Sequence, residues 1–166
     1  MASIKTITID GFYSTEESNT LINSVYDLGY SEFDFGKEIE NFNLVPENAN
    51  SLFSSALNMN LGVNEETSGV FRIPKSFIHF EGFSSSDDWI FVVALQESTF
   101  NIFEHKSGIK DATQGHLLNY FNLFEWDLTV NYVLKPGQGI LFRPWLFHSF
   151  DSGLIQLFRI VEHKVH

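Results

Sequence analysis

The chain has 166 residues, the length of one domain or of one domain with a small appendage, and 43% of them are hydrophobic. Ten Lys and Arg against 21 Asp and Glu give a net charge of −11, which disfavours binding to a nucleic-acid backbone or to an anionic membrane. Cysteine is absent, which excludes disulfides, thiolate zinc sites and cysteine nucleophiles. Since neither a signal peptide nor a membrane-length apolar run is visible, we expect a soluble cytoplasmic protein.

The N-terminal part predicts one strand followed by a helix. Residues 4–10 alternate apolar and polar side chains, the period of a strand. Ser14 and Glu17 form a capping box that begins a helix, because each side chain can bond the backbone N–H of the other. Apolar residues follow at helical spacing over residues 21–28, and Gly29 is a plausible end.

A second helix is expected from about Pro46 to Leu61, ended by Gly62. Its predicted buried face consists of Leu52, Phe53, Ala56 and Leu57. Strand-like sequence begins near Val70. The predicted strands are residues 76–80, 89–95, 99–103, 128–134, 139–142 and 154–161.

Two connections complete this assignment. Residues 135–138, Lys-Pro-Gly-Gln, predict a turn, and residues 104–125 predict a connection that is partly helical around residues 117–124. Helices first and short strands afterwards favour a mainly β protein with N-terminal helices packed outside a sandwich or barrel. We expect residues 1–166 to form a single domain, with residues 1–65 packed on a barrel core of residues 70–166.

One group of residues suggests metal chemistry. His79 and Glu81 are two positions apart, so in a strand they face the same side, and His148 lies 69 residues later. Two imidazoles and one carboxylate on one face of an octahedron are the ligand set of non-haem Fe(II) oxygenases. Each residue also has a structural interpretation: a half-buried strand histidine, a solvated carboxylate and a loop histidine bonded to backbone.

The order of these features resembles the 2-oxoglutarate- and Fe(II)-dependent oxygenase superfamily, which is built on a double-stranded β-helix, also called a jelly roll. The segment from Ile7 to Ile22 resembles the strand-then-helix start of prolyl-hydroxylase-like members, and the chain looks most like the small phage- and marine-bacterium-type members. Residues 134–148 (LKPGQGILFRPWLFH) resemble the family's turn, buried strand and distal histidine.

The resemblance implies a jelly-roll (cupin-like) fold and a dioxygenase that hydroxylates a small molecule or a protein side chain. It implies that His79, Glu81 and His148 hold Fe(II), and that Arg159, 11 residues after His148, binds the distal carboxylate of 2-oxoglutarate. The sequence departs from the family at Glu81, where Asp is usual, and at Val161, where a hydroxyl residue is frequent.

Other residues keep two interpretations. Arg72 could bind a substrate anion or pair with one of the many carboxylates, and Trp145 could wall the pocket or belong to the core. The remaining histidines rank below the proposed pair as ligands; they are His105, His116, His163 and His166. The alternative function is a cupin-like binding module or pseudo-enzyme without redox metal, and a homodimer is considered because jelly rolls often dimerise.

Overall fold

The computed structural model describes most of the chain. The described residues are 5–28, 31–33, 36–40, 61–72, 78–81, 88–114, 118–120, 122–151 and 153–162. The strands are β1 (Thr6–Ile9), β2 (Ser31–Phe33), β3 (Gly36–Glu40), β4 (Leu61–Arg72), β5 (Trp89–Ala94), β6 (Ser98–His105), β7 (Trp126–Leu134), β8 (Gly139–Phe142), β9 (Phe147–Asp151) and β10 (Leu154–Glu162). The helices are α1 (Thr15–Leu28) and the short 3-10 turns η1 (Ala112–Gln114) and η2 (Leu123–Glu125).

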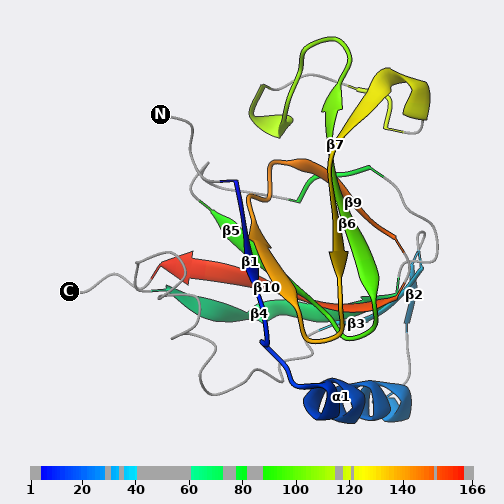
Figure 1. Ribbon diagram of the computed structural model, residues 1–166, viewed down its shortest axis with the longest axis vertical. Coiled ribbons are helices and arrows are strands. Elements are labelled where there is room, and N and C mark those ends of the chain that lie inside the picture. Colours follow the sequence, from blue (N-terminus) through cyan, green and yellow to red (C-terminus); the bar gives the residue numbers. More distant parts are fainter. Residues whose placement is uncertain are drawn as a thin grey trace.

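The strands form two antiparallel sheets (Figure 1). The large sheet has the order β1-β8-β5-β10-β4-β3-β2, and the small sheet has the order β7-β6-β9. From β5 to β10 the chain crosses between the sheets at every step except the β6–β7 connection. This winding is that of a double-stranded β-helix, so the predicted jelly-roll fold is confirmed.

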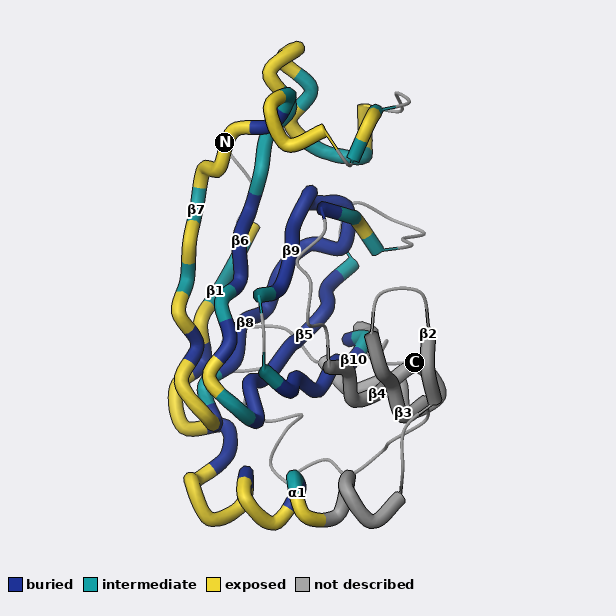
Figure 2. The backbone as a smooth tube through the Cα atoms, turned by 90° about the vertical axis from the view of Figure 1, so that its right-hand side faces the viewer, coloured by how far each residue is buried: buried dark blue, intermediate teal, exposed yellow. Residues whose placement is uncertain are grey.

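Strand β5 consists of the uninterrupted apolar run that the sequence shows at residues 89–94. All six of its residues are buried because both faces of the large sheet are covered. Phe91 and Val93 pack on the outer side against Leu21 of α1 and against Phe12. The even-numbered residues of β5 belong to the core cluster between the two sheets. Figure 2 shows β5 buried along its length. Full burial of each Val, Ile or Phe side chain of β5 contributes roughly 1.5–3 kcal/mol to the stability of the fold.

Helix α1 begins as the sequence predicts. The backbone N–H of Ser14 donates to Glu17 Oε1 at 3.0 Å, and the backbone N–H of Glu17 donates to Ser14 Oγ at 3.0 Å. These two bonds complete the capping box. Gly29, the expected end of this helix, lies outside the described residues.

The strands predicted at residues 89–95, 99–103, 128–134, 139–142 and 154–161 are confirmed as β5, β6, β7, β8 and β10, and the first strand is confirmed as β1. The predicted end of the second helix is wrong, because Leu61 and Gly62 begin strand β4, nine residues before the change expected near Val70. Pairing with β10 and β3 on its two sides determines this strand, and such pairing overrides local preference. Residues 46–60 of the predicted helix lie outside the described part of the chain.

Three smaller differences concern the region around the site. The candidate strand at residues 76–80 is reduced, where it is described, to an isolated bridge at His79. Strand β9 was not predicted. The described residues of the connection over 104–125 contain two short 3-10 turns, and η2 overlaps the helix expected around residues 117–124.

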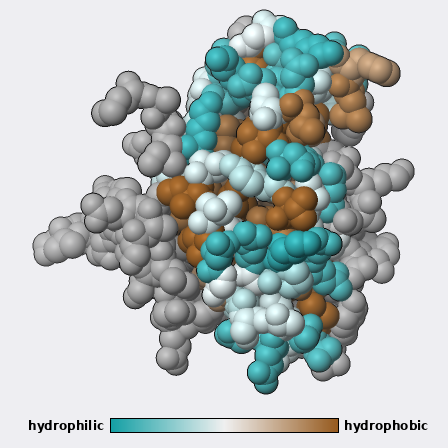
Figure 3. Space-filling view, viewed as in Figure 1, coloured by the Kyte–Doolittle hydropathy of each residue, from teal (hydrophilic) through white to brown (hydrophobic). Residues whose placement is uncertain are grey.

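The surface shows hydrophobic side chains interspersed with hydrophilic ones on the face that carries β7 (Figure 3). The exposed large apolar residues include Leu123, Phe124, Leu128 and Val133. Within the described part of the chain, no helix is both long and apolar enough to cross a membrane.

The predicted turn over residues 135–138 generates a stability test. Gly137 has a φ of +87°, and a Cβ at this position would lie 2.0 Å from the backbone oxygen of Tyr13. Gly108 also has a positive φ, +99°, but a Cβ there would meet no atom within 4 Å. We expect Gly108→Ala to lower the free energy of unfolding by about 1 kcal/mol through backbone strain alone. Gly137→Ala should lower it by about 3 kcal/mol, because the clash is added. Urea denaturation of both variants measures the difference, and equal losses would contradict this packing of the turn on Tyr13.

Candidate metal centre

A pair of backbone hydrogen bonds brings the two histidines together. His79 N donates to His148 O at 2.9 Å, and His148 N donates to His79 O at 2.9 Å. Residues that exchange both bonds lie directly opposite each other in an antiparallel pair, with their side chains on the same face. Because His148 also lies opposite Ile102 of β6, the segment 78–81 extends the small sheet beyond β9. A third bond, from Glu81 N to Pro144 O at 2.8 Å, holds the end of this segment.

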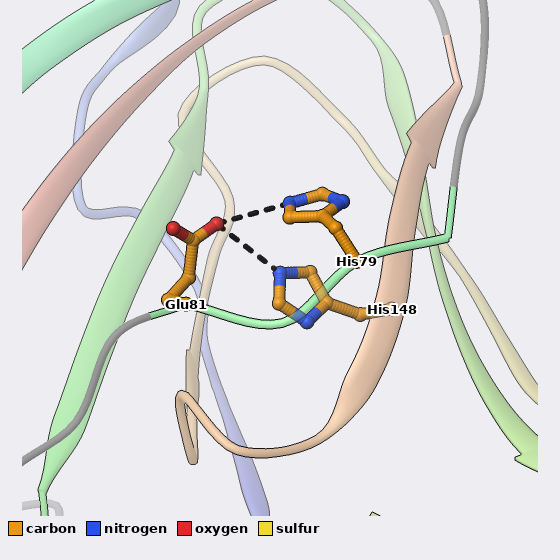
Figure 4. A group of neighbouring side chains, drawn as sticks. All are labelled: His79, Glu81 and His148. Atoms are coloured by element: carbon orange, nitrogen blue, oxygen red, sulfur yellow. Dashed lines mark hydrogen bonds and ion pairs between the residues drawn. The ribbon is translucent and has the colours of Figure 1, made fainter. Parts of the chain in front are cut away.

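The three predicted ligands converge on one point (Figure 4). His79 Nε2 lies 3.0 Å from Glu81 Oε1, and His148 Nε2 lies 3.5 Å from the same oxygen. One ligand atom from each residue lies within 4.8 Å of the others. Residues i and i+2 of an extended segment face the same side, which accounts for the approach of Glu81 to His79.

His148 is fixed in the orientation that a metal ligand requires. The side chain is 0% exposed, and rings of Phe100, Phe142 and Phe150 surround it at centroid distances of 5.7, 4.8 and 5.5 Å. Its Nδ1 donates to the backbone oxygen of Leu146 at 2.7 Å, so the lone pair of the neutral ring lies on Nε2. That buried Nε2 has no hydrogen-bond partner. An unsatisfied buried acceptor costs about 1–3 kcal/mol, and a bound metal ion would remove this cost.

The electrostatics of the group favour an ionised Glu81 carboxylate beside a neutral His148 imidazole. Burial alone would raise the pKa of Glu81, but the close polar and charge interactions with His148 and His79 outweigh it and hold the pKa well below its usual range. Burial, together with the neighbouring His79, lowers the pKa of His148 despite the opposing effect of Glu81. A carboxylate without its proton and a neutral imidazole are the forms that bind a metal.

The residues therefore fit a divalent transition metal. Two imidazole nitrogens and one carboxylate oxygen suit Fe(II), and three protein ligands leave coordination positions for other molecules. The orphaned Nε2 of His148 is the observation from this structure that supports the fit.

Arg159 occupies a position on the interior face of the large sheet. It lies opposite Ile90, which lies opposite Phe142. Ile90 and Phe142 belong to the core between the sheets, and the ring of Phe142 contacts His148. With strands about 4.8 Å apart, Arg159 is roughly 10 Å across the sheet from Phe142.

Two predicted pocket residues have different surroundings. Trp145 is buried within the core between the sheets, and its backbone oxygen accepts a bond from Ala112 N. The backbone of Arg72 lies at the end of β4 opposite Leu154, and its side chain is outside what the structure describes. Neither placement tests the predicted contact with substrate.

Among the alternative ligands, only His105 lies in the described residues. Its Nδ1 lies 2.7 Å from Ser107 Oγ, and its Nε2 lies 3.9 Å from Glu125 Oε2. His116, His163 and His166 lie outside the described part. Sequence analysis missed the carbonyl of Leu146, which a local turn before β9 brings to the ring two residues later, and the ring of Phe100, whose contact depends on the pairing of β6 with β9.

Solved structures of other proteins share the fold of this chain, although their sequence identity to it is low. No protein-family model matches the sequence, and no curated protein sequence does. Among solved structures, the non-haem α-ketoglutarate-dependent epimerase SnoN from nogalamycin biosynthesis matches with a TM-score of 0.68 and 11% identity, over 95% of this chain and 78% of SnoN. HygX from Streptomyces hygroscopicus, with nickel, 2-oxoglutarate and hygromycin B bound, matches with a TM-score of 0.65 and 10% identity, over 95% of this chain and 83% of HygX.

A third structure is the viral collagen prolyl hydroxylase of Paramecium bursaria Chlorella virus-1 in its 2-oxoglutarate complex. It matches with a TM-score of 0.56 and 16% identity, over 95% of this chain and 96% of that chain. The chain therefore has the double-stranded β-helix fold of 2-oxoglutarate- and Fe(II)-dependent oxygenase structures.

The protonation states predict how the metal-free protein responds to acid. A group whose pKa is lower in the folded state binds fewer protons there than in the unfolded chain, so stability falls as the pH falls. We expect the free energy of unfolding to decrease below about pH 6.5, the usual pKa of histidine, through His148, and further below pH 4.5 through Glu81. Urea denaturation with chelator present between pH 7 and 5 measures it, with His148→Asn as the comparison. A variant that loses as much stability as the wild type over this range would contradict the assignment to His148.

Proposed function

We propose that this chain is an Fe(II)- and 2-oxoglutarate-dependent oxygenase that hydroxylates its substrate. The observation that carries the proposal is the convergence of ligand atoms from His79, Glu81 and His148 on the interior side of a double-stranded β-helix. The buried Nε2 of His148, which has no hydrogen-bond partner, supports it. The fold alone would not, because one fold carries many functions.

In this proposal, His79, Glu81 and His148 hold the iron. The bound iron and 2-oxoglutarate supply the oxidation of a substrate C–H bond by O₂, with 2-oxoglutarate converted to succinate and CO₂. The protein contributes orientation and a dry environment. The Leu146 carbonyl keeps Nε2 of His148 directed at the site, and the surrounding Phe rings exclude water from that ligand.

Arg159 is proposed to bind the distal carboxylate of 2-oxoglutarate. Its position on the interior face, in the same row of the large sheet as Phe142, supports this role. A guanidinium can grip a carboxylate through two parallel hydrogen bonds, which fixes both distance and orientation.

The proposed substrate is a small molecule or a protein side chain. A net charge of −11 works against a polyanion such as nucleic acid. HygX is described with the small molecule hygromycin B, and the viral enzyme is named for prolyl groups of collagen. A cytoplasmic location and a homodimer stay predictions from the sequence.

A metal-free binding module is the second candidate, and one contact favours it. His79 Nε2 and Glu81 Oε1 lie 3.0 Å apart, so these two side chains satisfy each other without a metal. This candidate predicts neither a gain in melting temperature with divalent metal nor consumption of 2-oxoglutarate. A ligand that binds only the native state must stabilise it, so a thermal shift separates the two functions.

Replacing His148 tests the oxygenase directly. We expect His148→Ala to lower succinate formation from 2-oxoglutarate by at least about 100-fold, because loss of a ligand should exceed the 10–100-fold cost of losing its supporting partner. His105→Ala, which changes a histidine outside the site, is the control and should retain turnover. Iron-dependent succinate formation that is unchanged in His148→Ala would refute the assignment.

Replacing Arg159 tests the cofactor site separately. We expect Arg159→Ala to weaken 2-oxoglutarate binding by at least about 30-fold, the equivalent of about 2 kcal/mol for a lost charge-paired hydrogen bond. Metal affinity without 2-oxoglutarate should stay near that of the wild type, because Arg159 is not a ligand. Calorimetric titration measures both constants. An unchanged 2-oxoglutarate constant would remove Arg159 from the cofactor site.

A further inference from the structure

The segment that carries His79 and Glu81 lies beside β9 and outside the named strands. Backbone hydrogen bonds connect His79 with His148 and Glu81 with Pro144. A metal site needs its ligands held to within about 0.5 Å of the productive geometry. The side chains of Ile78 and Phe80, which alternate with the two ligands, supply further contacts that hold the segment in place.

Ile78 and Phe80 alternate with the two ligands, so they face the opposite side of the segment. Ile78 is buried in a cluster with Trp126 and Phe147. The Phe80 ring lies 6.3 Å from the ring of Tyr120 and 6.3 Å from that of Phe147, measured between centroids. Both side chains therefore pack against the same group of rings.

Phe147 connects this group to the other ligand strand. It precedes His148 in β9 and alternates with it, so it faces away from the metal group. Its ring lies 4.9 Å from Trp126 in an edge-on arrangement and 5.9 Å from Tyr120. Tyr120 in turn stacks on Trp126 at 5.6 Å. Edge-on and stacked ring pairs each contribute about 0.5–1.5 kcal/mol beyond the burial of their area.

The connection between β6 and β7 supplies Tyr120. This connection lies at the end of the molecule opposite α1 (Figures 1 and 2). Trp126 Nε1 donates to the backbone oxygen of Asn119 at 3.0 Å, which holds the residue before Tyr120 against the start of β7. The connection therefore reaches both ligand-bearing segments from the side away from the metal group.

We propose that Phe80 and Tyr120 are positioning residues, whose contact holds His79 and Glu81 at His148 from the far side of the ligand segment. This inference rests on the proposed function, since it concerns the affinity of the metal site. Phe80 is 41% exposed and Tyr120 is half-buried, so replacing either removes the contact without emptying the core. The buried rings of Phe147 and Trp126 are structural.

The test compares metal affinity with stability. Metal-free protein is titrated with Co(II) in place of Fe(II). The dissociation constant and the Co(II) absorption spectrum are measured for the wild type, Phe80→Ala, Tyr120→Ala and the double variant. We expect each single variant to bind roughly tenfold more weakly, within the range for residues that support metal ligands, with an altered spectrum. The double variant should lose less affinity than the sum of the two single losses, because both single variants remove the Phe80–Tyr120 contact.

Two controls separate positioning from general destabilisation. Tyr120→Phe keeps the ring and should restore wild-type affinity and spectrum. Phe124→Ala removes a Phe ring that is 89% exposed and lies in the same connection, and it should change neither. The melting temperature of each metal-free variant shows whether it is folded, and a variant that does not fold contradicts the argument that its ring lies outside the core.

The outcomes distinguish this inference from the proposed function. Wild-type protein that binds no Co(II) overturns both. Wild-type protein that binds Co(II), with folded Phe80→Ala and Tyr120→Ala variants of equal affinity and spectrum, overturns the positioning role alone. Additive losses in the double variant also overturn it, because they would show two independent effects.

Discussion

The paired backbone hydrogen bonds between His79 and His148 are the constraint on which the site depends. They join segments that are 69 residues apart in the sequence, and they fix both imidazoles on the same face. Glu81 follows from the same pairing, because a residue two positions along an extended segment returns to that face. The jelly-roll winding makes this pairing possible. It places β9 in the small sheet, whereas β8 and β10, which precede and follow β9 in the sequence, lie in the large sheet.

The same constraint leaves a buried acceptor without a partner. The ring of His148 is enclosed by Phe residues, and its Nδ1 is already bonded to Leu146. Its Nε2 is therefore held toward Glu81 but lies 3.5 Å from that carboxylate without a hydrogen bond. The unsatisfied Nε2 lowers the stability of the metal-free fold, and a ligand that accepts its lone pair would remove this loss. With an imidazole of His79 and a carboxylate of Glu81 beside it, the ligand that fits is a divalent metal ion.

Much of the fold and the metal group could be predicted from local sequence. The capping box at Ser14 and the apolar run of β5 are local signals, and the spacing of His79 and Glu81 places both on one face. Strand β4 could not be placed correctly, because its start at Leu61 depends on pairing with β10 and β3. The Phe80–Tyr120 contact was equally inaccessible, since it depends on how the β6–β7 connection packs. Local periodicity placed His79 and Glu81 on one face, the family resemblance related them to His148, and long-range pairing determined which residues meet.

The most direct test of the account is an anaerobic calorimetric titration of metal-stripped protein with Fe(II), repeated with 2-oxoglutarate. We expect one Fe(II) per chain, followed by one 2-oxoglutarate that binds only when the metal is present. Binding of 2-oxoglutarate without metal, or no uptake of Fe(II), would contradict it, because the three converging side chains would then not form the iron site.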